Sequence, residues 1–191
     1  MRVGDYVQVN PKKPSKPPDG RVTFLPMDAI SEAGHITRRA IRNYDDVSNG
    51  YPGFADGDLL VAKITPCFEN GKGALVTGLE NSVGFGSTEF FVLRPSSSIE
   101  PRLLAHILHS EEFRRRGGSE MEGSAGQKRV SADFIRSFRF LCPESTLIQR
   151  DLADVLETAD RVTQTYFALR DQLLIEKRAL SHRLLSQNSA T

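Results

Sequence analysis

Apolar residues recur at alternating steps of three and four from Leu152 onward, with one polar step at Glu176. This spacing is the heptad pattern of a coiled coil, and it continues for about five heptads. At about 1.5 Å per residue it predicts one helix roughly 60 Å long. The expected seam consists of Leu152, Val155, Ala159, Val162, Tyr166, Leu169, Leu173, Leu180 and Leu184.

The chain changes composition just before this pattern begins. All 15 glycines and all 10 prolines precede Glu144, so the remaining stretch contains no helix breaker. Pro143 is expected to end the preceding strand, and Ser145 is a suitable residue to cap the helix. We therefore expect a globular domain over residues 1–143 and a long coiled-coil helix over residues 144–188.

A long helix with an apolar seam is unstable in water unless another helix covers the seam. Burying about ten such side chains, at roughly 1.5 to 3 kcal/mol each, would exceed the cost of association. The pattern therefore predicts a projecting helix whose seam is covered by another helix. The alternative is that the helix folds back over its own domain.

The first 143 residues predict an α+β fold with a small twisted sheet and short helices. Runs rich in β-branched and aromatic residues predict strands at 22–25, 59–64, 73–77, 89–93 and 138–142. Asn70-Gly71 predicts a hairpin turn between two of them. Helices are expected at 101–115 and 131–137, and the proline-rich segment 10–18 is expected to be an extended surface loop.

Charge and hydropathy limit the classes of protein to which the chain can belong. Lys and Arg total 25 against 24 Asp and Glu, a net charge of +1, so any nucleic-acid binding must use a local basic surface. No apolar run reaches the roughly 18 residues of a membrane span, and the start does not resemble a signal peptide. We therefore expect a cytoplasmic protein in which Cys67 and Cys142 are free thiols.

Strong catalytic motifs are absent from the sequence. It contains no phosphate-binding loop, no zinc-protease helix, no hydrolase elbow, no amino-methylation motif and no dinucleotide-binding glycine pattern. Gly84-Phe85-Gly86 is expected to be a turn at a strand end rather than a cofactor loop. The histidines are isolated from cysteines and carboxylate pairs, so no metal site is predicted. These absences favour a protein that binds without catalysing a reaction.

Polar residues gather at three expected turns, at 63–73, 84–90 and 123–129. Lys and Arg can pair with guanine O6 and N7, Asn can pair with adenine, and small hydroxyls suit phosphate contacts. Each turn taken alone is better explained as an ordinary solvated loop. Together they make a directed DNA-binding face reasonable, with the candidate contacts Lys63, Asn70, Lys72, Ser87, Thr88, Gln127, Lys128 and Arg129.

Four blocks of sequence contain these turns, and in this order they resemble the target recognition domain of type I restriction-modification specificity subunits. They are FLPMDAI at 24–30, GDLLVAKITPCFENGKGA at 57–74, GFGSTEFFVLRP at 84–95 and MEGSAGQKRV at 121–130. The resemblance covers most of residues 1–143, and the long helix that follows is also a feature of that family. Family members carry two such domains and two helices, whereas this chain carries one of each. It is therefore similar to half of a specificity subunit, and the resemblance implies that its helix pairs, in antiparallel fashion, with a second copy or a second half of the same kind.

The resemblance implies a non-catalytic subunit that reads one half of a bipartite target in double-stranded DNA. It also implies docking of modification subunits, which are adenine methyltransferases, and recruitment of a restriction (translocase) subunit through the complex. S-adenosylmethionine, ATP and Mg²⁺ would then be used by those partners, and this chain would bind no cofactor. The alternative is a coiled-coil interaction module or a regulator that competes for the modification subunit.

Overall fold

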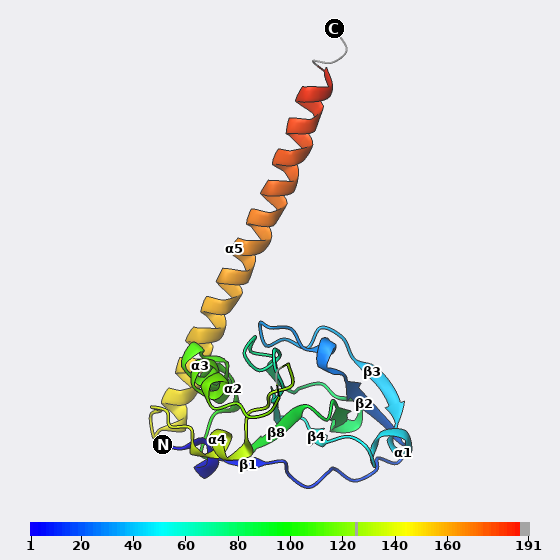
Figure 1. Ribbon diagram of the computed structural model, residues 1–191, viewed down its shortest axis with the longest axis vertical. Helices are drawn as coiled ribbons and strands as arrows, with labels where there is room; N and C mark the ends of the chain where they lie inside the picture. Colours follow the sequence, from blue (N-terminus) through cyan, green and yellow to red (C-terminus); the bar gives the residue numbers. More distant parts are fainter. Residues whose placement is uncertain (125, 188–191) are drawn as a thin grey trace. The chain divides into compact units, whose positions relative to one another are not determined.

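The α+β class expected from the sequence is confirmed (Figure 1). The computed structural model describes residues 1–124 and 126–187, with side chains described as far as His182. The chain divides into two compact units, Met1–Arg150 and the residues from Asp151 onward. The division falls inside the long helix, which places the first turn of that helix in the first unit.

The first of two four-stranded sheets is antiparallel throughout. Its strands, in spatial order, are β1 (Val7–Val9), β8 (Phe90–Pro95), β5 (Leu59–Ala62) and β6 (Gly73–Leu75). The central strands β5 and β8 bury almost every residue, which explains why their sequences are continuous apolar runs. The strand predictions at 59–64, 73–77 and 89–93 are confirmed, with ends shifted by a few residues.

The second sheet is mixed, because β2 and β7 run parallel while the other neighbours are antiparallel. Its order is β3 (Ala40–Asn43), β2 (Arg21–Leu25), β7 (Val83–Gly86) and β4 (Gly53–Ala55). The sequence predicted one small sheet, and the structure has two. Strands β1, β3 and β4 contain only three or four residues each, so they are too short for sequence patterns to reveal them.

The segment Gly84-Phe85-Gly86 was expected to be a turn, and that expectation was wrong: these residues are part of the buried strand β7. A Cβ atom on Gly84 would lie 2.1 Å from the ring of Phe54. The glycine is therefore required for close packing of a side chain against the strand rather than for a turn.

Four short helices follow the sheets or connect their strands. The expected single helix over 101–115 is two helices, because Ser110 has an extended backbone and its Oγ accepts a hydrogen bond from the backbone N–H of Phe113. The helix expected at 131–137 is confirmed, with Ser131 as its cap. The four are α1 (Tyr44–Val47), α2 (Pro101–His109), α3 (Glu111–Ser119) and α4 (Ala132–Ser137). Short 3-10 turns lie at Val3–Asp5, Met27–Ala29 and Glu80–Ser82.

No strand forms at 138–142, contrary to expectation. Arg139 makes only an isolated bridge with Arg2, and the backbone N–H of Phe140 donates to the carbonyl of Met1. The segment lies beside the amino terminus without joining a sheet. The proline-rich segment, in contrast, is an extended loop as predicted, because Pro11–Pro17 is neither helix nor strand.

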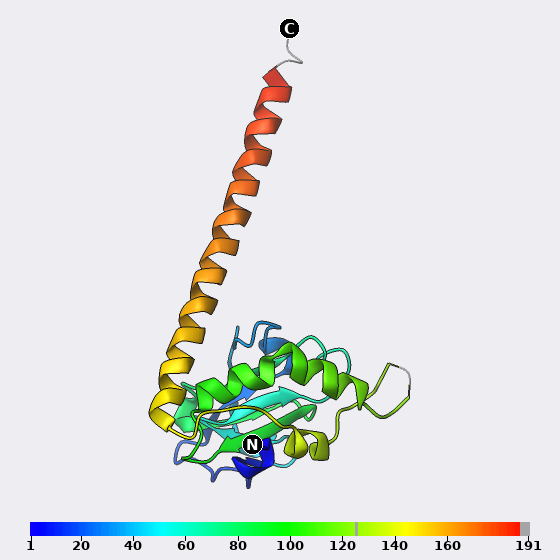
Figure 2. The ribbon, with the colours of Figure 1, turned by 90° about the vertical axis from the view of Figure 1, so that its left-hand side faces the viewer.

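Aromatic rings fill the core between the first sheet and helices α3 and α4. Phe113 lies 4.9 Å from Phe138 and 5.3 Å from Phe134, measured between ring centroids, and Phe68 completes the cluster. Figure 2 shows α2 and α3 following one another across the strands of this sheet. The cluster anchors the loop that contains Phe68, which connects β5 to β6.

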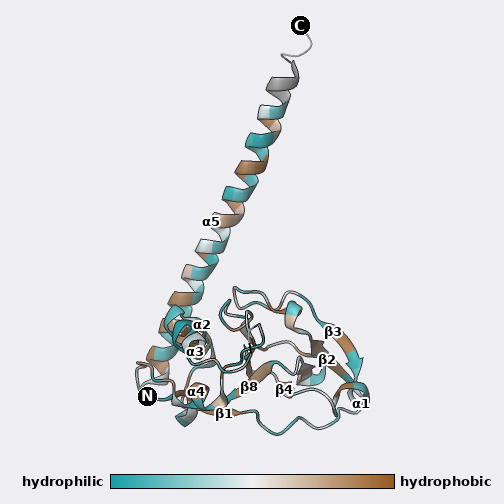
Figure 3. Cartoon of the chain, viewed as in Figure 1, coloured by the Kyte–Doolittle hydropathy of each residue, from teal (hydrophilic) through white to brown (hydrophobic). Residues whose placement is uncertain are grey.

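The long helix α5 (Thr146–Gln187) is continuous and begins directly after Ser145. Apolar residues recur along it among polar ones (Figure 3). Seam side chains are exposed, from 40% at Leu152 to 66% at Val155. Leu184 lies within the helix, but its side chain is outside the described residues. Within the described chain, no helix has the length and apolar character needed to span a membrane.

Candidate functional site

The structure brings the three predicted polar turns together. The loop 63–72 joins β5 to β6, and the backbone N–H of Lys63 donates to the carbonyl of Glu89 at 2.9 Å. On the other side, the backbone N–H of Thr65 donates to the carbonyl of Lys128 at 2.9 Å. The backbone N–H of Val130 in turn donates to the carbonyl of Lys63 at 2.9 Å. Backbone hydrogen bonds therefore place segments from three distant parts of the chain beside one another.

The third turn is a hairpin closed at its base by Glu122 and Arg129. The two residues exchange backbone hydrogen bonds of 3.0 and 2.9 Å. Gly123 has a φ of 128° and approaches the carbonyl of Gln127, so a Cβ atom there would lie only 2.8 Å from that oxygen. The glycine is required by the backbone, and the base of the hairpin is held firmly against residues 63–65.

Arg129 and Glu89 form a bidentate ion pair at this junction. Nε and Nη2 of Arg129 donate to the two carboxylate oxygens of Glu89 at 3.0 and 2.8 Å. The side chains are 43% and 25% exposed. Hydrogen bonding to Arg129 lowers the pKa of Glu89, and the charges of Arg129 and Lys63 add to that effect against the opposing influence of burial. The same hydrogen bonds raise the pKa of Arg129.

The remaining candidates at the junction differ in their exposure and in the interactions of their side chains. The hydroxyl of Ser87 accepts a hydrogen bond from the backbone N–H of Glu89, so Ser87 shapes the turn, while Thr88 is exposed. Lys63 is half-buried and its ammonium lies 5.6 Å from the centre of the Phe91 ring. Gln127 is exposed. Lys128 is exposed and has no ion pair with any side chain in the described part of the chain.

Asn70 and Lys72 interact with residues outside this junction. The Asn70 amide donates to a carboxylate oxygen of Glu32 at 2.6 Å. Lys72 is half-buried, and its positive charge contributes to lowering the pKa of Asp28, which is set mainly by hydrogen bonding to Arg38. Within the described residues, neither side chain forms a hydrogen bond or ion pair with Arg129 or Glu89. The structure thus gives Asn70 and Lys72 interactions outside the junction.

Sequence reasoning did not select Glu89, although it lies within a quoted block. An acidic residue is not expected to contact a polyanion, because like charges repel. The pairing of Glu89 with Arg129 also spans 40 positions of sequence, so local patterns do not indicate it. Among the described residues, no group of His, Cys, Asp and Glu is arranged to hold a metal ion.

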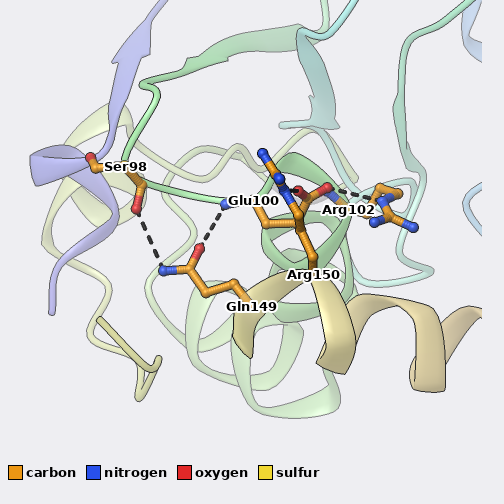
Figure 4. A network of polar contacts seen from close by, with 5 residues as sticks. All are labelled: Ser98, Glu100, Arg102, Gln149 and Arg150. Atoms are coloured by element: carbon orange, nitrogen blue, oxygen red, sulfur yellow. Dashed lines mark hydrogen bonds and ion pairs between the residues drawn. The ribbon is translucent and has the colours of Figure 1, made fainter. Parts of the chain in front are cut away.

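A second polar network, also missed from the sequence, holds the first turn of α5 (Figure 4). Gln149 is buried, its Oε1 accepts from the backbone N–H of Glu100 at 2.7 Å, and its Nε2 donates to the carbonyl of Pro143 at 2.8 Å. The Glu100 carboxylate pairs with Arg102 at 2.9 Å and with Arg150 at 3.5 Å. This network fixes the start of α5 to the start of α2.

Comparison with known proteins identifies relatives of the chain. It is 42% identical over 134 residues to the type I restriction enzyme EcoAI specificity subunit of Escherichia coli, an alignment covering 68% of this chain and 22% of that protein. It is 37% identical over 150 residues to the EcoEI specificity subunit of the same organism, covering 76% of this chain and 25% of that protein. The chain thus spans about a quarter of the length of these curated relatives. No family model matches it.

The fold is shared with a solved structure. The HsdS subunit of Thermoanaerobacter tengcongensis superposes with a TM-score of 0.73 over 94% of this chain and 46% of that chain, at 20% identity. This likeness supports the fold of the recognition domain and the long helix.

Proposed function

The chain belongs to the family of type I restriction enzyme specificity subunits, and on that premise we propose that it reads one half of a bipartite DNA target. It acts without catalysing a reaction, as the specificity component of a complex. Its target is double-stranded DNA, and the complex acts in the cytoplasm.

The observation that carries this proposal is the convergence of three polar turns on one surface of the recognition domain. Lys63, Lys128 and Arg129 lie within one backbone hydrogen-bond network although the whole chain has a net charge of only +1. Glu89 balances the charge of Arg129, so Lys63 and Lys128 supply the local positive charge that would direct a polyanion to this surface. Rigidly held turns that present donors are also what reading base edges requires.

We propose that α5 pairs with a second copy of the chain, or with a second half-subunit, in antiparallel fashion. Support comes from the large apolar seam residues of the described helix, from Leu152 to Leu180, which are at least 40% exposed. Two recognition domains related by a two-fold axis would read a palindromic bipartite site. The length of the paired helices would set the spacer between its halves.

We further propose that the complex recruits its catalytic partners through this chain. Modification subunits would methylate adenine with S-adenosylmethionine, and a restriction (translocase) subunit would join through the complex and use ATP and Mg²⁺. The chain itself would bind none of these cofactors. The sequence contains no motif for binding these cofactors. The partners are inferred from membership of the specificity-subunit family.

Co-purification with the modification subunits, followed by mapping of methylated adenines with and without this chain, tests the proposal. Methylation at one defined bipartite sequence only when the chain is present is the expected result. Methylation that proceeds at the same sites without the chain would contradict it. If the chain instead blocks methylation directed by a complete specificity subunit, it is a regulator that competes for the modification subunit.

Lys128→Ala tests the surface itself. The change should weaken binding to all duplexes and reduce the slope of log affinity against log salt by about one unit, as expected for one lost phosphate contact. Lys177→Ala, at an exposed position of α5, is the matched control. Equal affinity of the two variants for duplex DNA would show that Lys128 is not part of the DNA-binding surface.

A further inference from the structure

Arg129 has donors to spare after its contacts within the protein are counted. A guanidinium carries five N–H groups. Nε and Nη2 donate to Glu89, and Nη1 donates to the carbonyl of Gln127 at 3.3 Å. One N–H therefore remains on Nη1 and one on Nη2 for a ligand.

Both the backbone and the side chain of Arg129 are held in place. Its backbone pairs with Glu122 on one side and bridges to Ile64 on the other. Val130, the next residue, is buried, and successive residues of an extended segment point to opposite faces. Arg129 is thus directed outward, where Glu89 fixes the plane of its guanidinium. Such preorganisation reduces the rotamer entropy lost on binding.

Phosphate is an unsuitable target for this pair. Glu89 cancels the charge of Arg129, so the pair would release few counterions on binding a phosphate, and the carboxylate would repel it. A planar fork with a fixed orientation instead matches guanine O6 and N7, which accept two parallel hydrogen bonds in the major groove. Lys128 beside it, exposed and without an ion pair within the described chain, is the better phosphate contact.

We propose that Arg129 determines specificity for a guanine in the target and that Glu89 is the residue that positions it. The inference rests on the proposed function, because it assigns a base to a surface proposed to read DNA. It distinguishes two neighbouring cations, since Arg129 reads a base and Lys128 holds the backbone. It also explains why a surface proposed for a polyanion contains a carboxylate.

The test is selection from a pool of duplexes with a randomised region by the chain in complex with its modification subunits, followed by sequencing. The wild-type complex should select a site that contains a guanine. Arg129→Lys should reduce the preference for guanine at that position by about tenfold or more and leave the preferences at other positions unchanged. Glu89→Gln should relax the same position. Arg136→Lys, in an exposed Arg136–Asp133 pair on α4, is the control and should change no position.

The outcomes separate this inference from the proposed function. If the wild-type complex selects no sequence, the proposed function fails. If wild type selects a site and Arg129→Lys keeps every preference, only the inference fails. A uniform loss of affinity for Arg129→Ala with a salt slope reduced by about one unit would assign Arg129 to a phosphate and also overturn it. Thermal unfolding of each variant establishes that a loss of preference occurs in a folded protein.

Discussion

Gln149 Oε1 accepts a hydrogen bond from the backbone N–H of Glu100 at 2.7 Å. A residue in the first turn of α5 therefore binds the N-cap residue of α2. Because Gln149 also donates to the carbonyl of Pro143, its amide satisfies a donor and an acceptor of the backbone at once. Gln149 is only 1% exposed, so its amide shields both of these backbone groups from water.

Replacement of Gln149 by Ala should therefore lower the free energy of unfolding by about 2 kcal/mol, because two backbone groups lose their partners. Urea unfolding measures the change as a lower midpoint at an unchanged slope. Gln172→Ala, an exposed glutamine on the same helix, should change stability by less than about 0.5 kcal/mol. Equal midpoints for the two variants would show that the network does not stabilise the domain.

Adjacent glycines in α3 should respond in opposite directions to the same substitution. A Cβ atom on Gly117 would lie 2.3 Å from the Phe68 ring and 2.8 Å from the Phe134 ring. Gly117→Ala should therefore destabilise the domain by about 1–3 kcal/mol through overpacking. The Cβ of Gly118 would meet only Glu69 Cγ at 3.6 Å, so Gly118→Ala should stabilise by up to about 1 kcal/mol. Thermal melts that shift in the same direction would contradict this reading of the core.

Charges placed in the seam of α5 should prevent the proposed pairing. Leu169→Glu combined with Leu173→Glu would bring like charges to a buried seam, and we expect a dimer to become a monomer at micromolar concentration. Multi-angle light scattering after size exclusion measures the mass. Gln164→Glu with Ala168→Glu adds charges on another face of the same helix and should leave the dimer intact. A wild-type chain that is monomeric at this concentration would exclude self-pairing.

The Glu89–Arg129 pair should make stability depend on pH in the acid range. Its hydrogen bonds hold the pKa of Glu89 below the ordinary 4.5, so the unfolded state binds more protons as pH falls through this range. The stabilisation is therefore complete above about pH 5 and is lost as pH falls through the lowered pKa. The stability difference between wild type and Glu89→Gln, measured by urea unfolding, should shrink below about pH 4.5. A difference that is constant between about pH 3 and 7 would contradict the prediction.

Local pattern was sufficient where the burial of an element leaves a continuous apolar run in the sequence. The strands around Leu60 and Val92 were predicted because both faces of each strand are buried, which requires a continuous apolar run. The break at Ser110 was missed although the residues that cause it are adjacent, because the apolar spacing continues across it. The strand expected around Arg139 failed because this segment pairs with the amino terminus through an isolated bridge and does not join a sheet.

The candidate site was only partly predictable. The sequence predicted which turns carry donors, and backbone hydrogen bonds join these turns through Lys63, Glu89 and Lys128. Asn70 was selected on its chemistry, yet the structure engages its amide with Glu32, 38 positions away. Such competition between partners depends on side chains that only folding brings together.

The sequence by itself determined the long helix, the α+β class and the resemblance to specificity subunits. Helix propensity and heptad spacing act over a few residues, so they can be read directly along the chain. Only the tertiary structure decided that Glu89 orients Arg129 and that Gln149 joins α5 to α2. Those contacts connect residues 40 and 49 positions apart, and their formation depends on how the sheets and helices pack.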